Sequence, residues 1–276
     1  MNALVIRKQF EEFLREDLGH VEIDDRFWAM SRAVIIAEEP GVMCGGHLLE
    51  ELFATLCLRA ARPQILQRVN EGARFSPGET LVELTMHPEI LRNGIRTALN
   101  LLQHLSGIAT NTRTLVDRVK GTGCQLLDSR KTTPGLRVLE KYAVRTGGGR
   151  NHRFGLYDGI LIKKEDIAID GGIKAAITRA IDRAAHLTAI EVEVESLEQL
   201  REVLDDGRVR YVLLDNMNPD FVRAAIALAQ DRLIMEASGV NPDDLELYAA
   251  TGVPFISTSA LVRGGHALKM KMRTVK

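Results

Sequence analysis

The second half of the chain alternates short apolar runs with segments of helical periodicity, and this rhythm strongly limits the possible folds. Each run has the length of one buried strand, and each segment between two runs is long enough for a helix. Repeated strand–helix–strand units form a parallel sheet, as either an incomplete barrel or an open doubly wound sheet. The pattern does not separate these two. The runs are CQLLD, GILIK, AIEVEV, YVLLD, LIMEA and PFIST, with helices expected at about 135–146, 172–185, 197–205, 218–230 and 242–250.

The first third of the chain has a different pattern, in which helices accompany a small sheet. Apolar side chains recur at helical spacing over residues 3–18, which predicts an amphipathic helix. The stretch RAVIIAEEPGVMCGG predicts two strands on either side of Pro40 and Gly41, and a helix is expected from about His47 to Ala61. The stretch QILQRVNEGARFSPGETLVELTMH predicts two more strands with glycine-containing turns.

A long helical pattern separates these two parts of the chain. It begins at Pro88, and we expect it to be interrupted or bent near Ser106 and Gly107. We place a domain boundary at this point. The expected domains are residues 1–107, residues 108–262, and a C-terminal segment of residues 263–276 that returns to the N-terminal domain.

The composition argues against several classes of protein. The chain has 276 residues, of which 45% are hydrophobic and 26% are charged, and its formal net charge is -1. Without an overall basic field, binding to nucleic acid or anionic membranes through total charge is not expected. The three cysteines are widely spaced and form no disulfide or zinc pattern, and no apolar run approaches the roughly 18 residues of a membrane span. We therefore expect a cytoplasmic protein without an export signal.

The functional site is expected where the six strands end, because parallel sheets bind their ligands at the carboxyl ends of the strands. Glu191, Glu193 and Glu195 share one face of their strand by period-two alternation. Six strand ends that all carry polar groups in register indicate one shared site. The other polar groups are residues 128–133, Lys163, Asp215 with Asn216, Glu236 with Ser238 and Gly239, and residues 257–259.

Charges near these strand ends are sorted by sign. Between Asp128 and Lys164 there are nine Lys and Arg residues against three acids, a balance of +6 in a chain whose total is -1. This stretch predicts a polyanionic ligand that carries phosphates or carboxylates. The sign reverses at Glu193 and Asp215, which predicts a hydrated Mg2+ ion or sugar hydroxyls on that side. A phosphorylated sugar and an anionic co-substrate would use both sides.

Several of these features also have a simpler interpretation. Arg137, Lys141 and Arg145 are spaced four apart, as on a solvated helix face. The three glutamates at 191–195 could form the exposed face of an edge strand. The stretches SGV and STS, which follow the last two strands, could be turns and caps rather than phosphate-binding loops.

The stretch GGGRNHRFG at residues 147–155 combines three glycines with basic side chains. Phosphate-cradling glycine loops normally open a helix, whereas these glycines follow one, so we expect them to end it. Arg150 is expected to lie in solvent.

Residues 128–163, DSRKTTPGLRVLEKYAVRTGGGRNHRFGLYDGILIK, closely resemble the quinolinate phosphoribosyltransferases, and RTALNLLQHLSGIAT, IEVEVES and LLDNM agree. The resemblance covers nearly the whole chain. It implies a type II phosphoribosyltransferase, with an N-terminal α/β open-faced sandwich domain and a C-terminal incomplete six-stranded β/α barrel, working as a homodimer. The implied reaction joins quinolinate to 5-phosphoribosyl 1-diphosphate with Mg2+, and releases nicotinate mononucleotide, diphosphate and carbon dioxide.

The resemblance also implies roles for individual residues. The implied binding groups for the pyridine dicarboxylate are Arg130, His152 and Arg153, with Arg96 entering from the neighbouring subunit. The implied catalytic groups are Lys131 and Lys163 at the donor phosphates, and Glu193 and Asp215 at its ribose hydroxyls and the metal. The loops that would hold the 5-phosphate contribute Ser238, Gly239 and Ser259.

The chain departs from the family pattern at several positions. HVEIDD at 20–25 replaces a Gly-Asp pair with threonines, Ile95 replaces a glutamate, and LIKKED at 161–166 replaces LIKDNH. In the loops around the 5-phosphate, Val240 and Ser259 stand at glycine positions, and Arg263 replaces a histidine. Two alternatives therefore stay open. One is a paralogue that uses the same pocket for another aromatic or heterocyclic acid, and the other is a weakly catalytic ligand-binding accessory protein.

Overall fold

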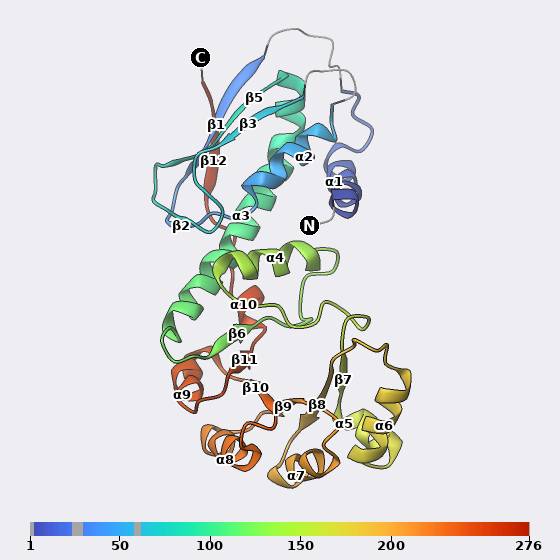
Figure 1. Ribbon diagram of the computed structural model, residues 1–276. Helices are drawn as coiled ribbons and strands as arrows, with labels where there is room; N and C mark the ends of the chain where they lie inside the picture. Colours follow the sequence, from blue (N-terminus) through green and yellow to red (C-terminus); the bar gives the residue numbers. More distant parts are fainter. Residues whose placement is uncertain (1–2, 24–29, 58–61, 276) are drawn as a thin grey trace. The chain divides into compact units, whose positions relative to one another are not determined.

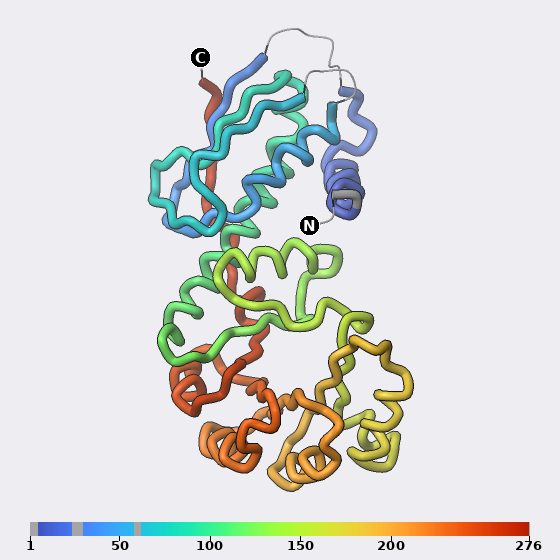
Figure 2. Tube along the Cα trace, viewed as in Figure 1, coloured from blue at the N-terminus to red at the C-terminus, as the bar shows by residue number. Residues whose placement is uncertain are grey.

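The computed structural model describes residues 3–23, 30–57 and 62–275, and the chain divides into two units (Figures 1 and 2). Unit 1 comprises Met1–Asn111 together with Gly265–Lys276, and unit 2 comprises Thr112–Gly264. We describe each unit by itself. The end of the HVEIDD stretch lies outside the described residues.

Unit 1 contains a four-stranded antiparallel sheet. Its order is β12 (Met270–Val275), β1 (Ser31–Ala37), β5 (Thr80–Met86) and β3 (Gln64–Gln67). The central strands β1 and β5 are rich in apolar and β-branched residues, which suit a sheet that is buried on one side. The edge strand β12 comes from the C-terminal segment, to which the sequence analysis assigned no strand.

Helices lie along one side of this sheet (Figure 1). They are α1 (Ala3–Leu18), the 3-10 helix η1 (Gly46–Leu48), α2 (Leu49–Ala54) and the first part of α3 (Pro88–Arg118). The predicted helix at 47–61 is shorter than expected. The amides of Leu56 and Cys57 bond to carbonyls only three residues back, which tightens and ends the helix, and residues 58–61 lie outside the description.

The region after α2 holds three strands where the sequence predicted two. The additional strand is β4 (Arg74–Phe75), which pairs with β2 (Gly41–Val42) in a separate two-stranded sheet. A two-residue strand carries no alternation that a sequence pattern could reveal.

Helix α3 runs without interruption through Ser106 and Gly107, so the predicted interruption there is wrong. The glycine is needed for another reason. A Cβ at Gly107 would collide with the carbonyl oxygen of His266, in the segment that leads into β12. Gly107 therefore allows close approach of two backbones.

Unit 2 contains a six-stranded parallel sheet. Its order is β6 (Gln125–Leu127), β11 (Phe255–Ser257), β10 (Ile234–Ser238), β9 (Tyr211–Asp215), β8 (Ile190–Val194) and β7 (Ile160–Ile162). From β7 to β11 each strand pairs with the next in sequence, so the order never reverses as it does in a doubly wound sheet. The fold is the incomplete barrel. The ring is open between β6 and β7, where Arg150 forms an isolated parallel bridge with Leu127.

The helices of unit 2 lie between successive strands of its sheet, except α10, which follows the last of these strands (Figure 1). They are α4 (Arg137–Gly147), α5 (Lys164–Asp170), α6 (Ile173–Arg183), α7 (Leu197–Asp206), α8 (Pro219–Ala229), η2 (Pro242–Asp244), α9 (Leu245–Ala249) and α10 (Ala260–Arg263). Ser196 and Asn218 cap the starts of α7 and α8, because their side chains accept backbone N–H bonds there. The sequence analysis missed α5 and α10. Helix α5 buries none of its residues and therefore lacks an apolar stripe.

Within the described residues, no helix combines the length and the apolar character that crossing a membrane requires.

Candidate functional site

A cavity of about 700 Å3 opens at the carboxyl ends of the unit 2 strands. Every site residue that the sequence analysis placed in this part of the chain lines it. They are Arg130, Lys131, His152, Arg153, Lys163, Glu193, Asp215, Ser238, Gly239 and Ser259. Arg96 belongs to unit 1, where it is exposed on α3. The predicted residues of unit 2 therefore lie together around one cavity.

Strand register sets the height of the acidic groups in the barrel. Ser238 of β10 is paired with Asp215 of β9 and with Ser257 of β11, so these three residues form one layer at the strand ends. Leu213 of β9 is paired with both Glu193 and Glu236, which form the next layer down. Because paired residues of parallel strands point to the same side, each layer presents its side chains together.

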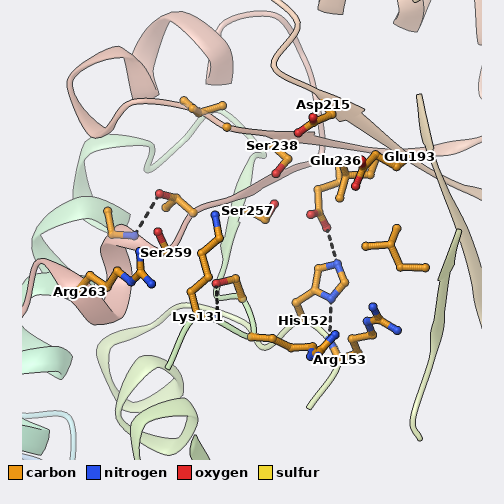
Figure 3. Close-up of a pocket in the computed structure, with 18 of the residues that line it drawn as sticks. Lys131, His152, Arg153, Glu193, Asp215, Glu236, Ser238, Ser257, Ser259 and Arg263 are labelled. Atoms are coloured by element: carbon orange, nitrogen blue, oxygen red, sulfur yellow. Dashed lines mark hydrogen bonds and ion pairs between the residues drawn. The ribbon is translucent and has the colours of Figure 1, made fainter. Parts of the chain in front are cut away.

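Glu193 and Asp215 form an acidic corner of the cavity (Figure 3). The Glu193 side chain is buried, and its Oε2 lies 3.7 Å from Nζ of Lys163. Burial raises the pKa of Glu193, Lys163 opposes this effect, and the charge of Asp215 adds to it. Two carboxylates with this mutual repulsion favour a cation or hydroxyl donors between them. Strand β8 lies between β7 and β9, so the interpretation of its glutamates as the face of an edge strand is wrong.

Arg130 and Arg153 form the basic side of the cavity together with Lys131. The Arg153 guanidinium donates to the carbonyl of Gly159 at 2.8 Å. Burial lowers the pKa of Arg153, and the neighbouring charge of Arg130 lowers it further. Two guanidinium groups that repel each other at a cavity wall are suited to bind a bidentate anion between them.

His152 lines the cavity, and Figure 3 shows its ring between Glu236 and the backbone of Arg153, with Nε2 3.6 Å from Oε2 of Glu236. Its Nε2 lies 3.1 Å from Oε2 of Glu191, and its Nδ1 accepts the backbone N–H of Arg153 at 2.7 Å. Burial disfavours the charged ring, but Glu191 and Glu236 outweigh this effect and raise the pKa of His152. An Nδ1 that accepts a hydrogen bond carries no proton, so this geometry corresponds to the neutral ring protonated on Nε2. In this arrangement neither nitrogen is free for a carboxylate.

Glu236 is a site residue that the sequence analysis mentioned at a strand end but gave no role. Its side chain is 4% exposed, and its Oε1 has no hydrogen-bond partner among the described residues. Burial, with the charge of Glu191, raises the pKa of Glu236 to about 7. The alternation in the strand IMEAS places Glu236 on the same face as Ser238, and this signal could have identified it.

Two groups of side chains could hold a cation. His152, Glu191 and Glu236 bring their ligand atoms within 4.8 Å of one another. A metal would need the Nε2 lone pair of His152, but the bond from the Arg153 amide to Nδ1 leaves the ring proton on Nε2. The oxygen pair of Glu193 and Asp215 fits a hard cation such as Mg2+ better, because it needs no change of tautomer.

The loops that follow β10 and β11 close the third side of the cavity, with Arg263 (Figure 3). Gly239 has a φ of 77°, and a Cβ there would collide with Oδ1 of Asn216. Val240 also lines the cavity, and it is 5% exposed. Ser259 occupies the N-cap position of α10 without a side-chain capping bond, and Arg263 follows one turn later with its side chain exposed.

The stretch GGGRNHRFG ends α4 as the sequence predicted. Gly148 adopts the left-handed conformation with a φ of 99° at the C-cap of the helix. Arg150 is exposed, and it also donates to Oε1 of Gln125 at 2.8 Å. The solvated helix face predicted for Arg137, Lys141 and Arg145 is wrong for Lys141, which is completely buried.

Comparisons with known proteins cover both units of the chain. The family described as "Quinolinate phosphoribosyl transferase, C-terminal domain" matches residues 108–273, and its N-terminal domain counterpart matches residues 28–106. The chain is 40% identical over 276 residues to the probable nicotinate-nucleotide pyrophosphorylase (carboxylating) of Bacillus subtilis, which covers 99% of this chain and 94% of that protein. It is 40% identical over 235 residues to the corresponding Mycobacterium leprae protein, with 82% and 80% covered.

Solved structures resemble the whole chain as well. The crystal structure of NadC from Streptococcus pyogenes matches with a TM-score of 0.91 at 31% identity, and covers 99% of this chain and 97% of that one. The nicotinate-nucleotide pyrophosphorylase of Francisella tularensis matches with a TM-score of 0.90 at 30% identity, covering 100% and 98%.

Proposed function

The chain belongs to the quinolinate phosphoribosyl transferase family, and we propose that its unit 2 cavity binds quinolinate at the basic side and 5-phosphoribosyl 1-diphosphate across the acidic corner. The enzyme is a decarboxylating phosphoribosyltransferase of NAD biosynthesis, which forms nicotinate mononucleotide, diphosphate and carbon dioxide. The observation that carries this proposal is the sorting of charge inside one cavity. Paired arginines suit a dicarboxylate, while buried carboxylates suit the ribose and its metal.

The proposed division of labour follows from where charge develops during the reaction. When diphosphate leaves C1 of the ribose, the sugar becomes an oxocarbenium-like cation, and Glu193 and Asp215 stabilise this positive charge. Lys131 and Lys163 stabilise the negative charge on the departing diphosphate. Nζ of Lys163 lies 3.7 Å from Oε2 of Glu193. This ion pair joins a residue proposed to act on the diphosphate to a residue proposed to act on the ribose.

Arg130 and Arg153 hold the two carboxylates of quinolinate so that the ring nitrogen faces C1 of the ribose. After the N–C1 bond forms, the ring nitrogen is positively charged. Loss of the neighbouring carboxylate as carbon dioxide leaves a ring carbanion beside this charge, and a proton from water completes the product. No strong general base is required, which agrees with a site built from cations and carboxylates.

Mg2+ is the proposed cofactor, and Glu193 and Asp215 are the proposed residues that would hold it. When bound, the ion would neutralise the diphosphate and shape its conformation. The support is the pair of oxygen donors on neighbouring strands, whose repulsion contributes to the raised pKa of Glu193. Hard oxygen ligands of this kind suit Mg2+.

Arg96 is proposed to complete the acid-binding pocket of the neighbouring subunit in a homodimer. Its exposure on α3 leaves it accessible to a second chain. A mixture of inactive Arg96→Ala and inactive Lys131→Ala chains should regain up to about a quarter of wild-type activity through hybrid sites. A mixture that demonstrably exchanges subunits but stays inactive would contradict the shared site.

The cytoplasm is the proposed location of the enzyme. Cys44, Cys57 and Cys124 form no disulfide bond in the part of the chain that the structure describes, which supports a reducing compartment. Burial raises the pKa of Cys124 to about 11, so its thiol stays protonated at neutral pH.

Titration calorimetry with quinolinate, followed by a product assay with 5-phosphoribosyl 1-diphosphate and Mg2+, tests the proposed function. We expect binding of quinolinate and turnover to nicotinate mononucleotide. Turnover of a different aromatic or heterocyclic acid, with no response to quinolinate, would assign the cavity to another acceptor. Binding without turnover of any acid would contradict the enzymatic function. Val240 lines this cavity at a position where the family has glycine, so the assay also decides whether its side chain allows the donor to bind.

A further inference from the structure

Unit 2 contains an ion pair that is completely removed from solvent. Asp128 follows the end of β6, Lys141 lies in the middle of α4, and both side chains are 0% exposed. Neither residue lines the 700 Å3 cavity. Burying two charges is costly, and a pair of hydrophobic residues in the same space is often as stable or more stable. A role beyond stability is therefore worth seeking in what the pair holds.

The pair binds the backbone on both sides of His152. The Asp128 carboxylate accepts the N–H of His152 at 2.8 Å and the side-chain amide of Asn151 at 2.6 Å. Lys141 Nζ donates to the carbonyl of His152 at 3.0 Å, and it lies 5.1 Å from the ring centroid of Phe154. The Asn151 amide also donates to the carbonyl of Lys141 at 2.9 Å. Residues 151–154 are thereby fastened to α4 and to the end of β6.

The hydrogen-bond pattern suits an ion pair: burial raises the pKa of Asp128 and lowers the pKa of Lys141, and the attraction between the two groups opposes both shifts. The partners of the Asp128 carboxylate named above are all donors, and those of the Lys141 ammonium are all acceptors or an aromatic face. A proton on Asp128 would point at one of these donors. Removing one member of the pair would leave the other as an isolated buried charge, whereas removing both would leave a neutral interior.

Residues 151–154, which the ion pair fastens, include Arg153, and the position of Arg153 depends on such a restraint. Arg153 follows His152 directly and faces Arg130, whose like charge repels it. Without a restraint on its backbone, Arg153 would relieve this repulsion by moving away into solvent. The carbonyl of Gly159, a buried residue directly before β7, anchors the guanidinium group of Arg153, but this bond holds the end of the side chain and not the backbone of Arg153.

We propose that the buried Asp128–Lys141 pair positions Arg153, so that two mutually repelling guanidinium groups stay preorganised for the dicarboxylate substrate. The inference rests on the proposed function of the cavity. Asp128 and Lys141 are positioning residues, because they act through the backbone of residues 151–153 and do not touch the substrate. Preorganisation of this kind improves binding of the acid substrate and leaves binding of the ribosyl donor unchanged.

The test separates positioning from stability by comparing single and double substitutions. Lys141→Met leaves Asp128 uncompensated and should lower both the melting temperature and quinolinate affinity. Asp128→Asn combined with Lys141→Met removes both charges, and its melting temperature should recover most of that loss. The matched control is Arg145→Met, which makes the same substitution one turn further along α4 at an exposed position. It should leave stability and both substrate affinities unchanged.

In the double variant we expect the quinolinate Kd to stay at least about 10-fold weaker than in wild type, while the KM for 5-phosphoribosyl 1-diphosphate changes less than about 2-fold. Recovery of quinolinate affinity together with stability would overturn the proposal, because the pair would then be purely structural. An equal loss of affinity for both substrates would overturn it as well.

Asn151→Ala keeps the test decisive if the double variant does not fold. This substitution removes only the amide that bridges Asp128 and the Lys141 carbonyl, and we expect about 3-fold weaker quinolinate binding from a folded protein. Unchanged quinolinate affinity in this variant would contradict the proposal.

Hydrogen exchange of peptides that cover residues 149–156 provides a measurement that needs no substrate. The His152 amide should exchange at least about 10-fold faster in the double variant than in Arg145→Met, because its acceptor has been altered. Equal exchange would overturn the positioning role. If wild-type protein fails to bind quinolinate, the proposed function fails, and the exchange experiment still decides whether the pair holds this segment.

Discussion

The cavity has two sides that are built in different ways. The acidic side, formed by Glu193, Asp215 and Glu236, projects from strands that are paired with neighbours on both edges. The basic side, formed by Arg130, Lys131, His152 and Arg153, lies where the ring is open between β6 and β7. Its residues occupy loops that are fastened by side chains of α4. Strand pairing therefore positions the groups proposed to act on the ribose, and tertiary tethers position the groups proposed to bind the acid.

This difference predicts how each side responds to substitution. A group on a paired strand keeps its place when neighbours change, so its removal should affect only the chemistry that it performs. A group in a tethered loop depends on residues that never touch the substrate. The following experiments test this contrast, from the largest expected effect to the smallest.

Glu193→Ala should reduce kcat by about 1,000-fold while the quinolinate Kd changes less than about 3-fold, because the carboxylate stabilises charge that develops only in the transition state. Steady-state kinetics together with calorimetry measure the two quantities. Glu195→Ala is the matched control, since Glu195 lies two residues further along and is exposed beside Lys164. A loss of acid binding as large as the loss of kcat would show that the two sides are not independent.

Glu236→Gln should make the protein more stable than wild type at high pH and equally stable at low pH. The pKa of Glu236 is raised to about 7 in the folded protein, so the unfolded chain binds this proton more weakly, and wild type loses stability as pH rises from about 4.5 to 7. The expected difference above pH 7 reaches about 3 kcal/mol.

Urea unfolding at a series of pH values measures this difference. Glu202→Gln, at an exposed position on α7, is the control and should show no trend with pH. If the free energies of unfolding of wild type and Glu236→Gln changed with pH in the same way, the ionised Glu236 carboxylate would not destabilise the folded protein.

Arg153→Ala should weaken quinolinate binding by about 100-fold and leave the KM of the ribosyl donor within about 2-fold, because one arm of a charge-assisted clamp is lost. Arg150→Ala, three residues earlier and in contact with Gln125, is the control with unchanged binding. If quinolinate affinity survived the loss of Arg153, the basic side would not be the acid-binding side.

Arg263→Ala should raise the KM for 5-phosphoribosyl 1-diphosphate by about 5-fold with little change in quinolinate binding, because an exposed cation at the rim contributes about 1 kcal/mol. The effect should shrink as ionic strength increases. An Arg263→Lys variant that binds the donor as well as wild type would indicate that positive charge rather than guanidinium geometry matters here. A donor KM that does not respond to Arg263→Ala would remove this residue from the phosphate side.

The architecture of unit 2 was largely predictable from the sequence, because strand alternation and helix periodicity are local signals. The helices α4, α6, α7 and α8 begin and end within two residues of their predicted bounds. The strand order excludes the doubly wound alternative, which periodicity could not do, since both architectures share the same local pattern. Helix α5 was missed because it buries no residue and has no periodic signal.

The candidate site was predictable where a residue stands at a strand end, and less so where it depends on the third dimension. Lys141 looks like a surface residue in sequence, since Arg137 and Arg145 flank it at helical spacing. Only the approach of Asp128 from another element explains why it is buried. The state of His152 also escaped prediction, because it depends on Glu191 of β8 and on the amide of Arg153. A sequence motif identifies which residue types occupy a site. It does not show which atoms of those residues already have hydrogen-bond partners in the folded protein.

The opening of the ring between β6 and β7 also bears on how such an enzyme could be re-engineered. Many of the contacts of residues 128–158 close within that stretch: Asp128 with Lys141, Glu140 with the Thr133 amide, and Asp158 with the amide of Phe154. A stretch that makes many of its contacts within itself and contains no strand of the sheet should be exchangeable as one segment. Transplanting it between relatives should transfer the choice of acid without dismantling the machinery for the donor, provided that the tethers are moved with the arginines.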